Sequence, residues 1–278
     1  MGTAKQYFSG LEGIFCCLID EQRTAAFQRA IKNTVRKGDV VADCGAGTGI
    51  LSLFAADAGA KIVYAIESDS RVLKNLQKTF ELNGYKKKII LIEGDVRSVR
   101  LPEKVDMIIA EMIATGLIEE LQVPAMNNML GFAKPDVRIV LESLELYADL
   151  VSNKNDYFGH KMNIIRYEYP EIKNLKATPM TAKVIYRKVD FSKVNNDNQV
   201  SLKSEFTILR DGNINGLRIS MRTIFYDGSI FDSSPAYCYP IILPVQDTAV
   251  KKGDRCLVSL SYEMCKGFNN LKYAVSRI

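Results

Sequence analysis

Short, continuously apolar runs alternate with segments of helical periodicity across residues 38–146 of the chain. The runs that we expect to be strands are Val40–Ala42, Ile62–Ile66, Lys88–Glu93, Val105–Ala110 and Arg138–Leu146. The segments that we expect to be helices are Ile50–Ala58, Asp69–Leu82 and Pro124–Gly131. Strands that are apolar throughout and alternate with helices predict a parallel sheet covered on both faces.

From about Glu142 the pattern changes to segments rich in β-branched and aromatic residues, separated by asparagine, aspartate and glycine turns. The main predicted strands are Met162–Tyr169, Ala182–Val189, Leu217–Phe225 and Cys256–Tyr262. Within the third of these, apolar positions alternate with Arg218, Ser220 and Arg222, which is typical of an antiparallel strand buried on one face. The second half therefore predicts an all-β sandwich or barrel.

Composition narrows the possible functions of this chain of 278 residues, 47% of them apolar, with a net charge of +5. No run approaches the ~18 uncharged apolar residues of a membrane span, so we expect no membrane partner and a cytoplasmic location. One histidine and six cysteines without Cys-x-x-Cys spacing predict no metal site. The charge permits weak attraction to nucleic acid, but no basic stripe interleaved with aromatics requires it.

A glycine-rich turn, Asp43–Gly49, follows the first apolar run and precedes the first helix. Gly45 and Gly47 allow positive φ and remove Cβ atoms that would block a ligand, and Gly49 lets the helix pack tightly against the sheet. The next strand-like run is closed by Glu67. A glycine turn at one strand end and a carboxylate at the next predict a pocket for an adenosine ribose.

Two further acids distinguish the cofactor, since enzymes that use NAD share the glycine turn. Asp43 would be repelled by a pyrophosphate, but it can accept from the ammonium group of S-adenosylmethionine, directly or through water. Asp95 follows the third strand, where it can hydrogen-bond an adenine amino group while Val96 packs on the ring. A turn or helix-capping role is the alternative for Asp95. Acids at three successive strand ends favour S-adenosylmethionine.

The segment 38–110 resembles the class I S-adenosylmethionine-dependent methyltransferases. Within that class, Gly45–Ser52 and the following Phe54–Ala60 are similar to protein arginine methyltransferases. The resemblance implies an α/β fold, in which a Rossmann-like methyltransferase domain precedes a C-terminal antiparallel β-barrel-like domain.

The same resemblance implies roles for four residues. Arg23, within Asp20–Thr24, matches the arginine that binds the methionine carboxylate of the cofactor, and Glu67 matches the ribose-binding acid. Glu111, at the end of the fourth strand, and Glu120, nine residues later, match the family's pair of catalytic glutamates.

A pair of carboxylates suits a guanidinium acceptor. Methyl transfer needs mainly in-line alignment, and two carboxylates can hold a guanidinium bidentately, localise its charge and steer one nitrogen toward the methyl group. The structural alternative is that Glu111 caps a loop while Glu119 and Glu120 begin a solvated helix face. We predict Glu111 and Glu120 as catalytic residues that orient a nitrogen of a protein side chain.

The second half of the chain departs from the family. Ala236–Pro240 stands where the family has a Thr-His-Trp loop, and Asn153–Lys176 is a shortened form of the segment that makes the dimer arm. The acceptor therefore stays open between a protein, a small molecule and RNA, a non-catalytic binding protein is the third alternative, and a homodimer is one possible assembly. It also stays open whether Tyr237 and Tyr239 shape the acceptor pocket or pack in the barrel.

These patterns predict a division of the chain into three parts. We expect residues 1–37 to form an N-terminal helical lid segment, residues 38–141 an S-adenosylmethionine-binding Rossmann-like domain, and residues 142–278 a β-barrel-like substrate domain.

Overall fold

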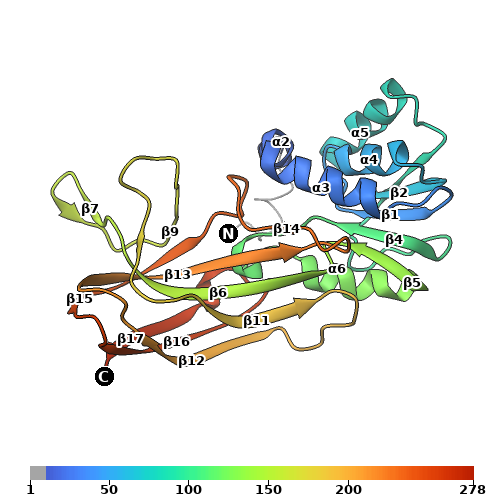
Figure 1. The fold of residues 1–278 in the computed structure, drawn as a ribbon. Helices are drawn as coiled ribbons and strands as arrows, with labels where there is room; N and C mark the ends of the chain where they lie inside the picture. The colour runs from blue at the N-terminus through green and yellow to red at the C-terminus, as the bar shows by residue number, and fades with distance from the viewer. Residues whose placement is uncertain (1–10) are drawn as a thin grey trace.

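The computed structural model describes residues 11–278, in which an α/β half precedes an antiparallel β half (Figure 1). Residues 1–10 of the predicted lid segment lie outside the described residues. The rest of that segment forms two helices, α2 (Leu11–Ile19) and α3 (Glu21–Thr34). No helix within residues 11–278 is long and apolar enough to cross a membrane.

A five-stranded parallel sheet forms the centre of the first half. Its strands, in spatial order, are β3 (Ile89–Glu93), β2 (Ile62–Glu67), β1 (Val40–Cys44), β4 (Val105–Ala110) and β5 (Ala133–Val140). Every residue of β1 is buried, because α3, α4 (Ile50–Asp57) and α5 (Ser70–Leu82) lie over one face and α6 (Gln122–Met129) over the other (Figure 1). The strand order reverses between β1 and β4, which is where open sheets of this kind bind ligands.

The predicted strand Arg138–Leu146 is wrong, because two strands of different sheets meet there. β5 ends at Val140 in the parallel sheet, and β6 (Ser143–Ser152) begins the antiparallel half. Between them Leu141 has a φ of 70°, a left-handed conformation that turns the chain and that a residue with a side chain adopts only when its surroundings hold it there. This turn separates the two halves of the molecule.

Two antiparallel sheets build the second half. The larger sheet contains β6, β9 (Arg166–Tyr167), β10 (Thr178–Pro179), β11 (Val184–Asp190), β13 (Gly212–Ile224), β14 (Ile230–Phe231) and β15 (Ile241–Val250). The smaller sheet contains β12 (Gln199–Thr207), β16 (Arg255–Glu263) and β17 (Lys272–Arg277), and a hairpin joins β7 (Asp156–Tyr157) to β8 (His160–Lys161). One hydrophobic core runs through both halves of the chain, and the predicted fold class is confirmed.

The prediction that the strand around Arg218 is buried on one face only is wrong. β13 lies between β6 and β15, and both Arg218 and Ser220 are buried. Arg218 can be accommodated because its guanidinium contacts Asp149 at 2.6 Å and Glu168 at 3.0 Å. A buried charge is tolerated only with such partners, so the alternation of polar and apolar residues here does not mark a solvent face.

Candidate active site

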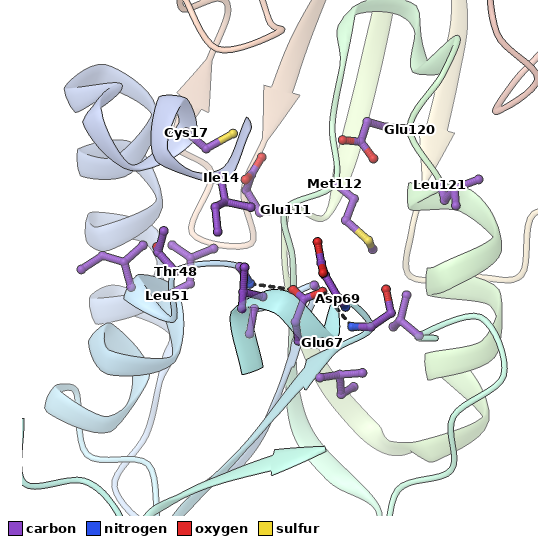
Figure 2. A pocket seen from close by; sticks show the side chains of 18 of the residues that line it. Ile14, Cys17, Thr48, Leu51, Glu67, Asp69, Glu111, Met112, Glu120 and Leu121 are labelled. Atoms are coloured by element: carbon purple, nitrogen blue, oxygen red, sulfur yellow. Dashed lines mark hydrogen bonds between the residues drawn. The ribbon is translucent and has the colours of Figure 1, made fainter. Parts of the chain in front are cut away.

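A cavity opens at the carboxyl ends of the parallel strands (Figure 2). Its empty space, counting the open mouth, is about 1310 Å³. Most of its lining comes from α2, α3, the glycine turn, the ends of β2, β3 and β4 and the loop before α6. The cavity is therefore an open cleft at the end of the sheet where ligands of such folds bind.

The glycine turn follows β1 and lies against the end of β2. Gly45 and Ala46 donate their main-chain N–H groups to the carbonyl oxygen of Ile66, at 3.0 and 2.8 Å. At Gly49, where φ is 83°, a Cβ would come within 2.5 Å of Leu76 Cδ1 and 2.6 Å of Phe80 Cε1. The tight packing predicted at Gly49 is therefore present, but the neighbour is α5 and not the sheet.

Glu67 closes β2 and ties the turn to it. Its carboxylate accepts from the main-chain N–H groups of Gly47 at 2.9 Å, Ser68 at 2.7 Å and Asp69 at 2.8 Å (Figure 2). The residue is buried and also lines the cavity. A carboxylate that accepts from several main-chain N–H groups is held in place, so Glu67 offers a fixed acceptor on the cavity wall.

Asp43 lies beneath the turn, outside the cavity lining. It is 1% exposed, and Ser52 donates to it from Oγ at 2.6 Å. Burial raises the pKa of Asp43 to about 6, partly offset by the Ser52 hydrogen bond. The structure therefore places Asp43 as a support for the turn and the first residues of α4.

Asp95 and Val96 both line the cavity after β3. The carboxylate of Asp95 accepts from Arg97, from the main-chain N–H at 3.0 Å and from Nε at 2.9 Å. This is the turn geometry of the alternative role considered for Asp95. Its position on the cavity wall remains compatible with a contact to a ligand.

Arg23, which is buried, and Glu111, which is partly buried, form an ion pair at the cavity edge. Arg23 comes from the first turn of α3, where Asp20 caps the helix by accepting from the Arg23 N–H at 3.2 Å. Glu111 directly follows β4. The same guanidinium donates to the carbonyl oxygen of Ala236, and its Nη1 lies 3.4 Å from Cys238 Sγ. Arg23 therefore joins three parts of the chain that are distant in sequence.

Glu119 and Glu120 lie in the loop that precedes α6, and both line the cavity. They do not begin a solvated helix face, which was the structural alternative. Burial raises the pKa of Glu120 to about 7, opposed by the positive charge of Arg23. In Figure 2 the side chains of Glu111 and Glu120 both lie above Glu67, Glu111 nearer Cys17 and Glu120 nearer Leu121.

Several residues near Glu111 and Glu120 were not predicted from the sequence as part of the site. Gln122 is fully buried and bridges the loop, accepting from Met112 N at 3.0 Å and donating to Ala110 O at 3.0 Å. Ile14 and Cys17 line the cavity from α2. Their helical spacing is that of any packed helix, so only the tertiary arrangement shows that they face a cavity.

Taken together, these features define a class of protein. The doubly covered parallel sheet, the glycine turn at its switch point and the acid at the end of β2 are those of a Rossmann-like enzyme that binds a nucleoside cofactor. Three acidic residues, Glu111, Glu119 and Glu120, line the same cavity.

Comparison with known proteins specifies the family. The family model of ribosomal protein L11 methyltransferase (PrmA) matches residues 22–136. The uncharacterized protein MJ1452 of Methanocaldococcus jannaschii is 33% identical, over 93% of this chain and 94% of its own length. Protein arginine N-methyltransferase 1 of Dictyostelium discoideum is 36% identical, over 59% of this chain and 49% of its own length.

A third relative, the histone-arginine methyltransferase CARMER of Drosophila yakuba, is 33% identical over 71% of this chain and 42% of its own length. The chain thus spans less than half the length of these two arginine methyltransferases. A chain of the solved Trypanosoma brucei PRMT1 enzyme-prozyme heterotetrameric complex with AdoHcy has the same fold, with a TM-score of 0.79, 19% identity and coverage of 100% of this chain and 99% of that chain. The chain belongs to the S-adenosylmethionine-dependent methyltransferases and is related to the protein arginine methyltransferases.

Proposed function

We propose that the protein transfers a methyl group from S-adenosylmethionine to a nitrogen of a protein side chain, with arginine as the best acceptor. The observation that carries this proposal is that Glu111 and Glu120 line the same cavity as the glycine turn and Glu67. Two relatives named as arginine methyltransferases support the same acceptor.

The chemistry of the lining fits the cofactor. Glu67 is a fixed acceptor suited to ribose hydroxyls, and Val96 offers an apolar contact for the adenine. Arg23 lines the cavity and is the cation suited to the methionine carboxylate, in addition to its ion pair with Glu111. The solved Trypanosoma brucei PRMT1 complex with AdoHcy supports this assignment.

When bound, S-adenosylmethionine supplies an electrophilic methyl group on its sulfonium. The protein's part is to hold the acceptor in line with that group and to compensate its charge. Glu111 and Glu120 can accept from two edges of one guanidinium, which localises the positive charge and leaves the third nitrogen for reaction. Glu120, with a pKa of about 7, is suited to accept the proton that the methylated nitrogen loses.

Arg23 and Gln122 are positioning residues for Glu111. Arg23 holds the carboxylate of Glu111 at the cavity edge, and Gln122 fixes the main chain on both sides of Glu111. Precise placement matters because misplacement of about 1 Å can reduce a rate by two orders of magnitude.

Tritiated-methyl labelling of a cell extract tests the acceptor. The purified protein is incubated with labelled S-adenosylmethionine and extract, and the product is treated with protease or with nuclease. We expect label that protease releases and nuclease does not. Label that survives protease would favour the small-molecule or RNA alternative, and binding of S-adenosylmethionine without any transfer would favour a non-catalytic protein. Association with a second copy and a cytoplasmic location stay predictions.

A further inference from the structure

The second half of the molecule contributes one side chain to the described lining of the cavity, that of Tyr237. All other described lining residues lie at or before Leu121. Tyr239, two residues later, is buried away from the cavity, where its hydroxyl donates to Glu171 at 2.9 Å and its ring meets Tyr169 edge-on at 5.7 Å. The two tyrosines therefore have different roles, and Tyr237 is the one that an acceptor would meet.

Tyr237 is held in an unfavourable backbone conformation, with a φ of 60°. Residues with a Cβ avoid this region unless the surrounding structure holds them there. Here the carbonyl oxygen of Tyr237 accepts from Thr115 N at 3.0 Å, and Thr115 Oγ1 donates to Tyr239 O at 2.7 Å. Asp20 accepts from Ala236 N at 3.0 Å. The loop is thus held on both sides, by α3 and by the loop after β4.

The charged groups around Tyr237 indicate which kind of acceptor group it can contact. Burial raises the pKa of the Tyr237 hydroxyl, and the nearby groups Cys17, Cys16 and Glu120 act in the same direction, while the positive charge of Arg23 opposes them. The phenol is therefore neutral at physiological pH, and it lies within the electrostatic reach of Glu120. A neutral aromatic ring beside a carboxylate suits a planar, weakly hydrated guanidinium better than a compact, strongly hydrated ammonium.

We propose that Tyr237 is a specificity-determining residue that selects a guanidinium over an ammonium acceptor. It does so by covering one side of the acceptor pocket with an aromatic ring while Glu120 binds the charge. This assignment rests on the proposed function, because it requires the acceptor to enter this cavity.

The test uses two peptides that differ only in an arginine or a lysine at one position. Their binding is measured by calorimetry with saturating S-adenosylhomocysteine, and their methylation by initial rates. The variants are Tyr237→Leu and Tyr237→Met, which remove the ring but keep a Cβ and hence the same backbone strain, and Tyr237→Phe, which keeps the ring. Tyr239→Phe, which loses its hydrogen bond outside the cavity, is the matched control.

We expect the wild type and the two phenylalanine variants to prefer the arginine peptide. Tyr237→Leu and Tyr237→Met should raise the KM for that peptide roughly tenfold, with kcat changed less than threefold and S-adenosylhomocysteine affinity unchanged. Unchanged cofactor affinity also shows that a variant is folded.

Two results would overturn the proposal. Wild-type KM and selectivity in the leucine and methionine variants would leave the proposed function intact, whereas equal use of both peptides by the wild type would also remove arginine as the best acceptor. A wild-type protein that binds S-adenosylhomocysteine but neither binds nor methylates either peptide would contradict the proposed function itself, and this assignment with it.

Discussion

At the scale of single residues, the carboxylate of Glu67 tests the cofactor site. Glu67→Ala should weaken S-adenosylmethionine binding by about 1.5–3 kcal/mol, roughly tenfold to 150-fold, because hydrogen bonds to a charged group are lost. Calorimetric titration with S-adenosylmethionine and S-adenosylhomocysteine measures this change.

Glu93→Ala is the matched control for this substitution. Glu93 ends the neighbouring strand β3 in register with Glu67, but it is exposed and lies outside the cavity lining. Its variant should bind both ligands as the wild type does. Equal affinities in the Glu67 variant and the wild type would remove Glu67 from the cofactor site.

Glu120 gives the protein a pH dependence. Its pKa of about 7 means that the acceptor-binding carboxylate forms as the pH rises through neutrality. We therefore expect kcat/KM for the acceptor to increase roughly tenfold between pH 6 and pH 8, since about a tenth of Glu120 is ionised one unit below its pKa. Initial rates at saturating cofactor measure the profile.

Glu120→Gln separates this role from a structural one. The variant keeps the shape of the side chain but has no charge, so transfer should fall at least a hundredfold and the rise with pH should disappear. Cofactor affinity should stay within threefold of the wild type. Retained activity with an unchanged pH profile would exclude Glu120 from the reaction.

Residue types and spacing predicted part of this arrangement. The positions of Glu111 and Glu120 relative to the fourth strand were visible in the sequence, and the structure brings both to one cavity. The pairing of Arg23 with Glu111 was not visible, because it joins residues 88 positions apart. The burial that raises the pKa of Glu120 likewise comes from packing, which spacing alone does not describe.

At the scale of elements, local chemistry predicted most boundaries in the first half. Val105–Ala110 is a strand as expected, and α5 ends at Leu82, where the predicted helix ends. Asp69 caps the N-terminus of α5, because its carboxylate accepts from Arg71 N at 3.0 Å. The wrong predictions concern the chain around Leu141 and the burial of β13. In both places the structure depends on strands that are distant in sequence, which a local pattern does not describe.

Gly49 tests how tightly two elements pack. Gly49→Ala should lower the free energy of unfolding by about 2–4 kcal/mol, because a Cβ adds left-handed strain and overlaps Leu76 and Phe80 of α5. Urea unfolding measures the loss. The matched control is Gly84→Ala, at a similar φ of 78° but with nothing within 4 Å of its Cβ, which should lose only about 1–2 kcal/mol. Equal losses in the two variants would contradict close packing at Gly49.

At the scale of the whole molecule, Asp20 connects the two halves. One carboxylate oxygen caps α3 and the other accepts from Ala236 N at 3.0 Å, across 216 positions of sequence. Asp20→Ala should therefore lower the free energy of unfolding by about 2–4 kcal/mol, through the lost cap and a buried N–H left without a partner.

Asp69→Ala serves as the comparison, since Asp69 caps α5 without joining the halves. Its loss should be about 1 kcal/mol, and both values can be obtained by urea unfolding. If the Asp20 variant lost no more than the Asp69 variant, the contact with the second half would contribute nothing to stability.

The sequence by itself determined the strand, turn and helix order around Asp43–Gly49 and the acid at the end of β2. These features depend on local requirements: apolar strands for a doubly covered sheet, and glycine where φ is positive. They were enough to indicate a nucleoside pocket, while the choice of S-adenosylmethionine rested on the further acids Asp43 and Asp95 and on the family resemblance.

Only the tertiary structure decided what surrounds the acceptor side of the cavity. Tyr237 reaches the cavity because Asp20 and Thr115 hold its loop, and Arg23 meets Glu111 because α3 packs beside the end of β4. Contacts of this kind join segments that are far apart in sequence, and their geometry depends on the packing of the complete core. No local pattern of residue types encodes that geometry, which is why only the folded molecule shows that Tyr237 lines the cavity and Tyr239 does not.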